Sequence, residues 1–227
     1  MPSLAEFRRP ILAYITDRRS LPLATSLDAS DLLLKRIGAL APAGIDWIQI
    51  REKDLGGRDC AALCARAIDA VRLAAGGAHT RVIVNDRLDI ALSLGAGGVH
   101  LGEDGLPVGE TRKLLAARDA PADFLCGVSC HSLETARLAE QSGADYIFFG
   151  PIFTTPSKAT YGPPQGLRRL EEVARSVVIP VIAIGGINLA SASSCLAAGA
   201  AGLAAIRLFQ DAPDPAGLIH TLRAARH

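Results

Sequence analysis

The chain repeats one alternation along its length: a short apolar run, then a stretch with helical periodicity. The runs are rich in aliphatic and β-branched residues, which predicts strands buried on both faces. Each run ends, at its carboxyl end, on glycine or on a polar side chain that can carry chemistry. Buried parallel strands alternating with helices, with reactive groups at one end, are typical of (β/α)8 barrel enzymes. The predicted fold is therefore α/β, a single (β/α)8 TIM barrel.

The strands are expected at residues 11–16, 47–52, 81–86, 98–101, 124–129, 146–150, 180–184 and 202–206. Four phrases support this register, because each places a helix-ending glycine just before a strand: AGIDWIQI, GAGGVHL, GADYIFFG and GAAGLAAI. Linkers and low-complexity segments do not interrupt the pattern. Residues 1–227 are therefore predicted to form one domain, close to the roughly 250 residues of a typical barrel.

Composition and charge limit the kinds of partner that this protein is expected to bind. The formal net charge is +1, so no overall field attracts nucleic acid or an anionic membrane. The sequence has neither the ~18-residue apolar run of a membrane helix nor a signal peptide at its start. The five cysteines lack zinc-finger spacing, so buried reduced thiols are expected. These features favour a cytoplasmic protein without nucleic-acid or membrane partners, and they leave its oligomeric state, including a homo-oligomer, open.

The sequence QIREK ends the second strand and carries the first candidate ligands. Gln49, Arg51 and Lys53 alternate, so all three side chains share one face of a strand. Pointed into the mouth of a barrel, they would offer an amide and two cations to one ligand. Glu52 faces the other way, and we expect it to be a structural partner.

Polar residues also end the third and fifth strands. Asp86, beside Asn85, is suited to two roles: a helix N-cap, or a carboxylate ligand of Mg²⁺, which takes few protein ligands and leaves room for phosphate oxygens. Ser129 is suited to donating a hydrogen bond to an anion. His131 is either an acid–base group or a structural residue in the first turn of a helix.

Two further segments suit phosphate. The long loop after the sixth strand, residues 151–164, carries hydroxyls and a lysine and is suited to a lid: Thr154, Thr155, Ser157 and Lys158. Gly185 and Gly186 follow the seventh strand, and Ile206 and Arg207 end the eighth. Many barrels bind phosphate on backbone N–H groups at these two places.

In this order and spacing, the motifs resemble those of the thiamine-phosphate synthase family and of its relatives, the thiazole tautomerases. They are QIREK, VNDRLDIAL, GVHLG, GVSCH, GADYIFFGPIFTTPSK and AIGGI. The resemblance covers nearly the whole chain. It implies phosphorylated small-molecule substrates, Mg²⁺ as cofactor, and release of pyrophosphate when a pyrimidine pyrophosphate joins a thiazole phosphate.

The resemblance also implies roles for single residues. The residues it places at the pyrimidine pyrophosphate are Gln49, Asn85 and Ser129, with Arg51, Lys53 and Lys158 as cations and Asp86 as one of two Mg²⁺-binding aspartates. Those it places at the thiazole phosphate are Thr155, Ser157, Gly186 and Ile206.

Two positions depart from the family pattern. The second Mg²⁺-binding aspartate is replaced by Gly105, and Asp104 lies one residue earlier, so Asp104 or Glu103 is the substitute ligand to consider. Arg207 stands where the family usually has a serine at the thiazole phosphate. The predicted function is thiamine-phosphate synthesis. The alternatives are a thiazole tautomerase, with His131 transferring the proton, and a non-catalytic binder of thiamine precursors.

Overall fold

The computed structural model describes residues 9–21, 28–74, 79–154 and 163–225. Three predicted site residues, Thr155, Ser157 and Lys158, lie outside these ranges. The strands are β1 (Ile11–Ile15), β2 (Trp47–Ile50), β3 (Arg81–Asn85), β4 (Gly98–Leu101), β5 (Leu125–Cys130), β6 (Tyr146–Phe149), β7 (Val181–Ile184) and β8 (Gly202–Ala205). They pair in chain order, all parallel, and β1 closes on β8. The predicted (β/α)8 barrel is confirmed.

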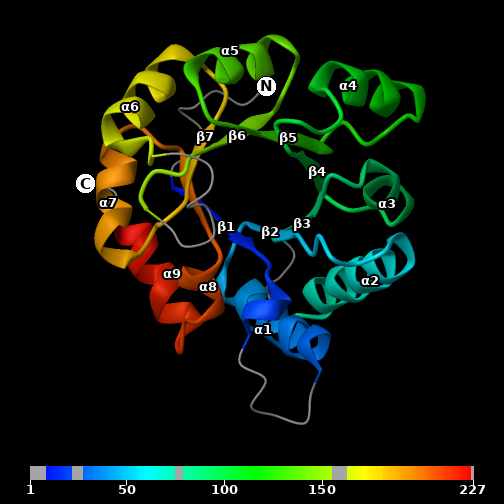
Figure 1. Ribbon diagram of the computed structural model, residues 1–227. Coiled ribbons are helices and arrows are strands. Elements are labelled where there is room, and N and C mark those ends of the chain that lie inside the picture. Colours follow the sequence, from blue (N-terminus) through cyan, green and yellow to red (C-terminus); the bar gives the residue numbers. More distant parts are fainter. Residues whose placement is uncertain (1–8, 22–27, 75–78, 155–162, 226–227) are drawn as a thin grey trace.

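The helices form a ring outside the barrel (Figure 1). They are α1 (Ala29–Ala43), α2 (Gly57–Leu73), α3 (Leu88–Ser93), α4 (Val108–Ala117), α5 (Leu133–Gln141), α6 (Gly166–Ser176), α7 (Leu189–Ala197), α8 (Arg207–Gln210) and α9 (Pro215–Ala224), with a 3₁₀ turn η2 (Arg18–Ser20) after β1. Ser132 and Asn188 begin α5 and α7 with capping boxes, as polar N-caps should. Within the described ranges, none of these helices is both long and apolar enough to span a bilayer.

Alternation along the strands produces two apolar layers. Ile48 and Ile50 of β2 face outward and pack in the large cluster between strands and helices. Trp47 faces inward, with Ile83, Tyr146 and others, and fills the barrel interior. Side chains one step further along the inward face therefore point to the carboxyl end of the barrel, where Gln49 lies.

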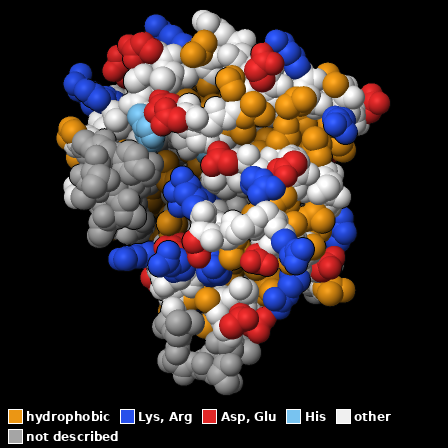
Figure 2. Space-filling model, turned by 45° about the vertical axis from the view of Figure 1, so that its right-hand side comes forward, with side chains coloured by type: hydrophobic (Ala, Val, Ile, Leu, Met, Phe, Trp, Pro, Cys, Tyr) orange, Lys and Arg blue, Asp and Glu red, His pale blue; other side chains and the backbone are white. Residues whose placement is uncertain are grey.

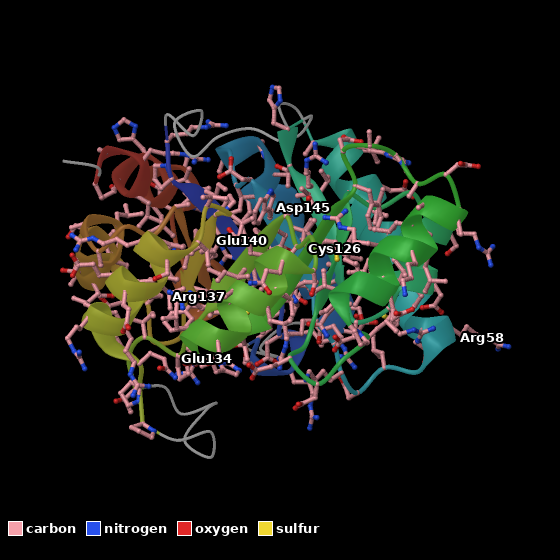
Figure 3. The ribbon with its side chains drawn as sticks, turned by 90° about the horizontal axis from the view of Figure 1, so that it is seen from above. Arg58, Cys126, Glu134, Arg137, Glu140 and Asp145 are labelled. Carbon is pink, nitrogen blue, oxygen red and sulfur yellow. The ribbon has the colours of Figure 1, made fainter. Side chains whose placement is uncertain are left out.

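Two of the repeated sequence segments, AGIDWIQI and GADYIFFG, form the same set of interactions at the end of the barrel where the strands begin. Asp46 precedes β2 and accepts a 2.7 Å hydrogen bond from the Leu12 N–H of β1. Asp145 precedes β6 and accepts a 2.6 Å hydrogen bond from the Cys126 N–H of β5, the pair labelled in Figure 3. Each carboxylate also pairs with an arginine, Arg223 at 2.8 Å or Arg112 at 2.6 Å. The repeat thus fastens neighbouring strands where they begin.

Several element ends differ from the sequence prediction. Strand β2 ends at Ile50, so Arg51 and Lys53 lie on the segment after it. His131 is not in the first turn of a helix, because β5 runs to Cys130 and α5 begins at Leu133. Arg207 does not end β8. It begins α8, a short helix that the sequence analysis missed.

Candidate active site

A chain of side chains runs across the barrel mouth from β2 to the end of β3. Gln49 Nε2 donates a 2.7 Å hydrogen bond to Asn85 Oδ1, and Asn85 Nδ2 donates one of 2.6 Å to Asp86 Oδ2. Gln49 is buried and Asp86 is exposed, so the chain leads from the interior to the rim. Because each amide orients the next, the three groups are held in one arrangement.

Asp86 is held from a second side. The Gly102 N–H, in the segment after β4, donates a 2.7 Å hydrogen bond to Asp86 Oδ1. The backbone of Asp86 is left-handed, with φ of +58°, a conformation that aspartate tolerates better than most residues. The N-cap position of α3 belongs to Arg87, without a side-chain cap. Of the two roles left open for Asp86, the helix cap is therefore contradicted.

Ser129 projects from β5 beside a buried histidine that the sequence analysis did not single out. His100 Nε2 lies 3.0 Å from Ser129 Oγ, and His100 Nδ1 lies 3.2 Å from the Tyr146 hydroxyl. The imidazole also packs on Phe148, with ring centroids 4.1 Å apart. The sequence signal for this site was a histidine inside the otherwise apolar run GVHL. In the structure, His100 is paired in register with Asn85 of β3.

His131 lies in the turn between β5 and α5. Its Nδ1 is 2.5 Å from the Gly150 carbonyl oxygen, so Nδ1 carries the proton and donates to that oxygen. Its Nε2 faces the Glu103 carboxylate at 3.8 Å. Glu103 is thereby placed beside an imidazole.

Cationic side chains border the mouth. Arg51 is half-buried, while Lys53 and Arg207 are exposed, and none of the three forms an ion pair with an acid in the described ranges. Glu52 is instead paired with Arg18 at 2.9 Å, which confirms its structural role. On the face shown in Figure 2, Lys and Arg are interspersed with Asp and Glu, in keeping with the small net charge.

The segments after β7 and β8 expose backbone groups, and the segment after β7 has an unusual backbone conformation. Gly185 and Gly186 both have positive φ, +94° and +69°. A Cβ on Gly185 would lie 2.6 Å from Pro151, and one on Gly186 2.7 Å from Phe153, so only glycine lets the loop after β6 approach this closely. The N–H groups of Gly186 and Ile206 donate to no acceptor in the described part of the chain. Such N–H groups are suited to binding an anion.

The donor set for Mg²⁺ is small. Among the described residues, no group of three or more His, Cys, Asp or Glu side chains could hold a metal ion. Asp86 accepts one hydrogen bond at each oxygen, which leaves lone pairs for a cation. Asp104 is exposed on the following turn. A Cβ at Gly105 would lie 3.3 Å from Asp86 Oδ1, so position 105 is directed at this carboxylate. One carboxylate with water and phosphate oxygens is sufficient for Mg²⁺, and Asp86 fits that role.

The fold, with these polar groups at the carboxyl ends of its strands, defines a (β/α)8-barrel enzyme, the class whose active sites lie at this end. The chain belongs to the thiamine monophosphate synthase family, whose family model matches residues 16–209.

Individual relatives agree with this assignment. The chain is 40% identical over 214 residues to a thiamine-phosphate synthase of Roseiflexus sp., covering 94% of this chain and 84% of that one. It is 46% identical over 171 residues to the thiamine-phosphate synthase of Methanospirillum hungatei, with 75% and 79% covered. The solved structure of a thiamine phosphate pyrophosphorylase from Pyrococcus furiosus matches with a TM-score of 0.79 and 29% identity, covering 98% of this chain and 100% of that one.

Proposed function

We propose that this protein is a Mg²⁺-dependent thiamine-phosphate synthase. It joins hydroxymethylpyrimidine pyrophosphate to thiazole phosphate and releases pyrophosphate. The observation that carries the proposal is the hydrogen-bonded chain Gln49–Asn85–Asp86 at the mouth, with Ser129 on the same inward-facing side of the barrel. This hydrogen-bonded series offers two side-chain amides and one carboxylate. Its ligand would be a polar ring joined to a polyanion.

In this reaction, bonds break and form only within the two substrates, and the protein forms no covalent bond with either of them. The bond between the pyrimidine methylene carbon and the pyrophosphate oxygen breaks, and its electron pair leaves with pyrophosphate. The thiazole nitrogen then gives its lone pair to the resulting pyrimidine cation, so the product is a thiazolium and no proton moves. The protein's task is therefore to bind, to orient and to neutralise charge.

The roles follow from that task. Arg51 and Lys53, which have no acidic partner among the described residues, face the charge that grows on the leaving pyrophosphate. Lys158 is proposed to join them. Mg²⁺ bound at Asp86 would neutralise part of the same charge. The N–H groups of Gly186 and Ile206, with Thr155, Ser157 and Arg207, are proposed to hold the thiazole phosphate.

A second function, thiazole tautomerisation, is favoured by the geometry of His131 and by the residue at position 105. His131 is oriented by the Gly150 carbonyl and faces Glu103, an arrangement suited to moving a proton. Gly105 also stands where the synthase pattern has a second Mg²⁺-binding aspartate, so a carboxylate that the pyrophosphate chemistry would use is missing at this position. A thiazole tautomerase would need the histidine and not the metal.

The deciding experiment incubates the protein with both synthase substrates, with and without Mg²⁺, and follows thiamine phosphate. Metal-dependent product supports the synthase. Without product, isomerisation of the non-aromatic thiazole precursor assigns the chain to the tautomerases. If neither reaction occurs, calorimetric binding of thiazole phosphate identifies a non-catalytic binder.

A further inference from the structure

Three neighbouring strands place Tyr146, Gly127 and His100 in one row of the barrel interior. Gly127 of β5 is paired in register with His100 of β4 on one side and with Tyr146 of β6 on the other. A Cβ at Gly127 would lie 2.1 Å from the Tyr146 ring. The missing side chain therefore lets the tyrosine ring cross β5, and its hydroxyl reaches His100 Nδ1 at 3.2 Å.

The buried phenol sets the direction of this hydrogen bond. Tyr146 is 1% exposed, and burial holds its pKa well above the usual value, so the hydroxyl keeps its proton. A buried O–H without an acceptor is costly. Among the described residues, His100 Nδ1 is the acceptor within reach of this hydroxyl. If Nδ1 carried a proton, the phenol would have no acceptor among the residues that the structure describes.

We infer that Tyr146 and His100 form a directed relay that fixes Ser129 as a hydrogen-bond donor toward the barrel mouth. The Tyr146 O–H donates to His100 Nδ1, which leaves the imidazole proton on Nε2. The Nε2–H then donates to Ser129 Oγ across 3.0 Å. Since that oxygen already accepts, its own proton turns away from the histidine. Tyr146 and His100 are positioning residues, and Ser129 is the group they orient.

The relay deepens the proposed function and rests on it for its consequence. A donor at Ser129 selects an acceptor atom of the bound pyrimidine pyrophosphate, a ring nitrogen or a phosphate oxygen, and disfavours an amino group at the same place. The pyrimidine ring presents both kinds of group, so a fixed donor selects one orientation of the ring. Binding in that orientation positions the carbon from which pyrophosphate departs.

The tautomer is tested on the unliganded protein, independently of any activity. Long-range ¹H–¹⁵N NMR assigned with His100→Gln should show His100 with a bare Nδ1 and a protonated Nε2. Tyr146→Phe removes one hydroxyl and should change the Nδ1 signal. Tyr14→Phe is the matched control, because it removes the hydroxyl of another fully buried tyrosine, bonded to Gln210 instead, and should leave His100 unchanged. A proton on Nδ1 in the wild-type protein overturns the inference.

A double-mutant cycle tests the consequence. Tyr146→Phe should lower kcat by about 5- to 30-fold, the loss expected from one oriented hydrogen bond. In a Ser129→Ala background the same change should have no further effect, because the group it orients is gone. Losses that multiply in the double variant would show that Tyr146 acts without Ser129 and would overturn the relay. An inactive wild-type enzyme would refute the proposed function, while the NMR measurement would still decide the tautomer.

Discussion

Asp86 accepts a 2.7 Å hydrogen bond from the Gly102 N–H, which ties the end of β3 to the segment after β4. The same carboxylate accepts from Asn85 on its other oxygen. One exposed aspartate therefore braces two neighbouring active-site segments and also offers the negative charge that a cation needs. These two roles can be separated by mutation.

Asp86→Asn should keep the bond from Gly102 through its remaining oxygen, but it removes the charge and, because its NH2 group cannot accept, the bond from Asn85 Nδ2. Asp86→Ala should remove all three. If the charge holds Mg²⁺, both variants lose thiamine-phosphate formation by on the order of 100-fold or more. Asp89→Asn is the control, because it removes an exposed acid that pairs with Arg87 at 2.5 Å. Steady-state rates over a Mg²⁺ series make the measurement. Near-normal turnover in Asp86→Asn would remove Asp86 from the metal site.

Gly105→Asp should place a second carboxylate beside Asp86, given the 3.3 Å approach of a Cβ at this position to Asp86 Oδ1. Two like charges repel, and the added Cβ would also lie 3.1 Å from the Gly102 carbonyl oxygen, so the variant should melt below the wild type without metal. Because it offers a second carboxylate, it should gain more stability from Mg²⁺ than the wild type does. Gly109→Asp adds the same charge where a Cβ meets nothing within 4 Å. Equal Mg²⁺ shifts in both variants, read from thermal melts, would contradict a cation site at Asp86.

Glu52→Gln should destabilise the fold by about 1–3 kcal/mol, since the half-buried N–H and guanidinium of Arg18 would lose a charged acceptor. Glu52 is 6% exposed and accepts from both the backbone and the guanidinium of Arg18. For a chain of this size, the melting temperature falls roughly 2–4 °C for each kcal/mol. Asp54→Asn, which alters the exposed partner of the same arginine, should have a much smaller effect. Equal melting temperatures for the two variants would refute the buried role of Glu52.

The cysteines should be inert in the folded protein. All five are free and buried, as the sequence predicted. Burial raises the pKa of Cys64 and Cys130 to about 12 and that of Cys126 and Cys195 to about 11. Mass spectrometry after iodoacetamide treatment at about pH 8 should find no adduct on the native protein and five after denaturation. Denaturation exposes every thiol, and it returns the pKa of Cys64, Cys126, Cys130 and Cys195 to the usual value of about 9. Rapid native labelling of any one cysteine would contradict its burial.

The same pKa shifts predict a loss of stability in alkali. Unfolded thiols release their protons at lower pH than folded ones, so unfolding becomes more favourable as pH rises from about 9, the usual thiol value, toward 12. Replacing Cys130 with alanine should flatten this slope, measured by denaturant melts across that range. An unchanged slope would assign the alkaline loss to other groups.

The sequence predicted the barrel well because strands buried on both faces leave a strong local pattern. The strand ends were less certain: β2 stops at Ile50, because the Arg51 N–H donates to the Thr16 hydroxyl and not to a backbone carbonyl of β1. Helix α8 is four residues long, too short for helical periodicity to appear. His100 and Tyr146 were missed as a pair because they are 46 residues apart, and only the register of three strands brings them together.

The last helix fastens the barrel at the end away from the mouth. Arg223 of α9 donates to the Gly44 carbonyl and to Asp46, and it also contacts the Pro10 carbonyl. A single guanidinium thus joins the segments that enter β1 and β2 to the helix that follows β8. The end of the barrel where the strands begin is therefore held by contacts that do not involve the loops at the mouth. Those loops can be exchanged or lengthened, by evolution or by an engineer, without destabilising the opposite end of the barrel.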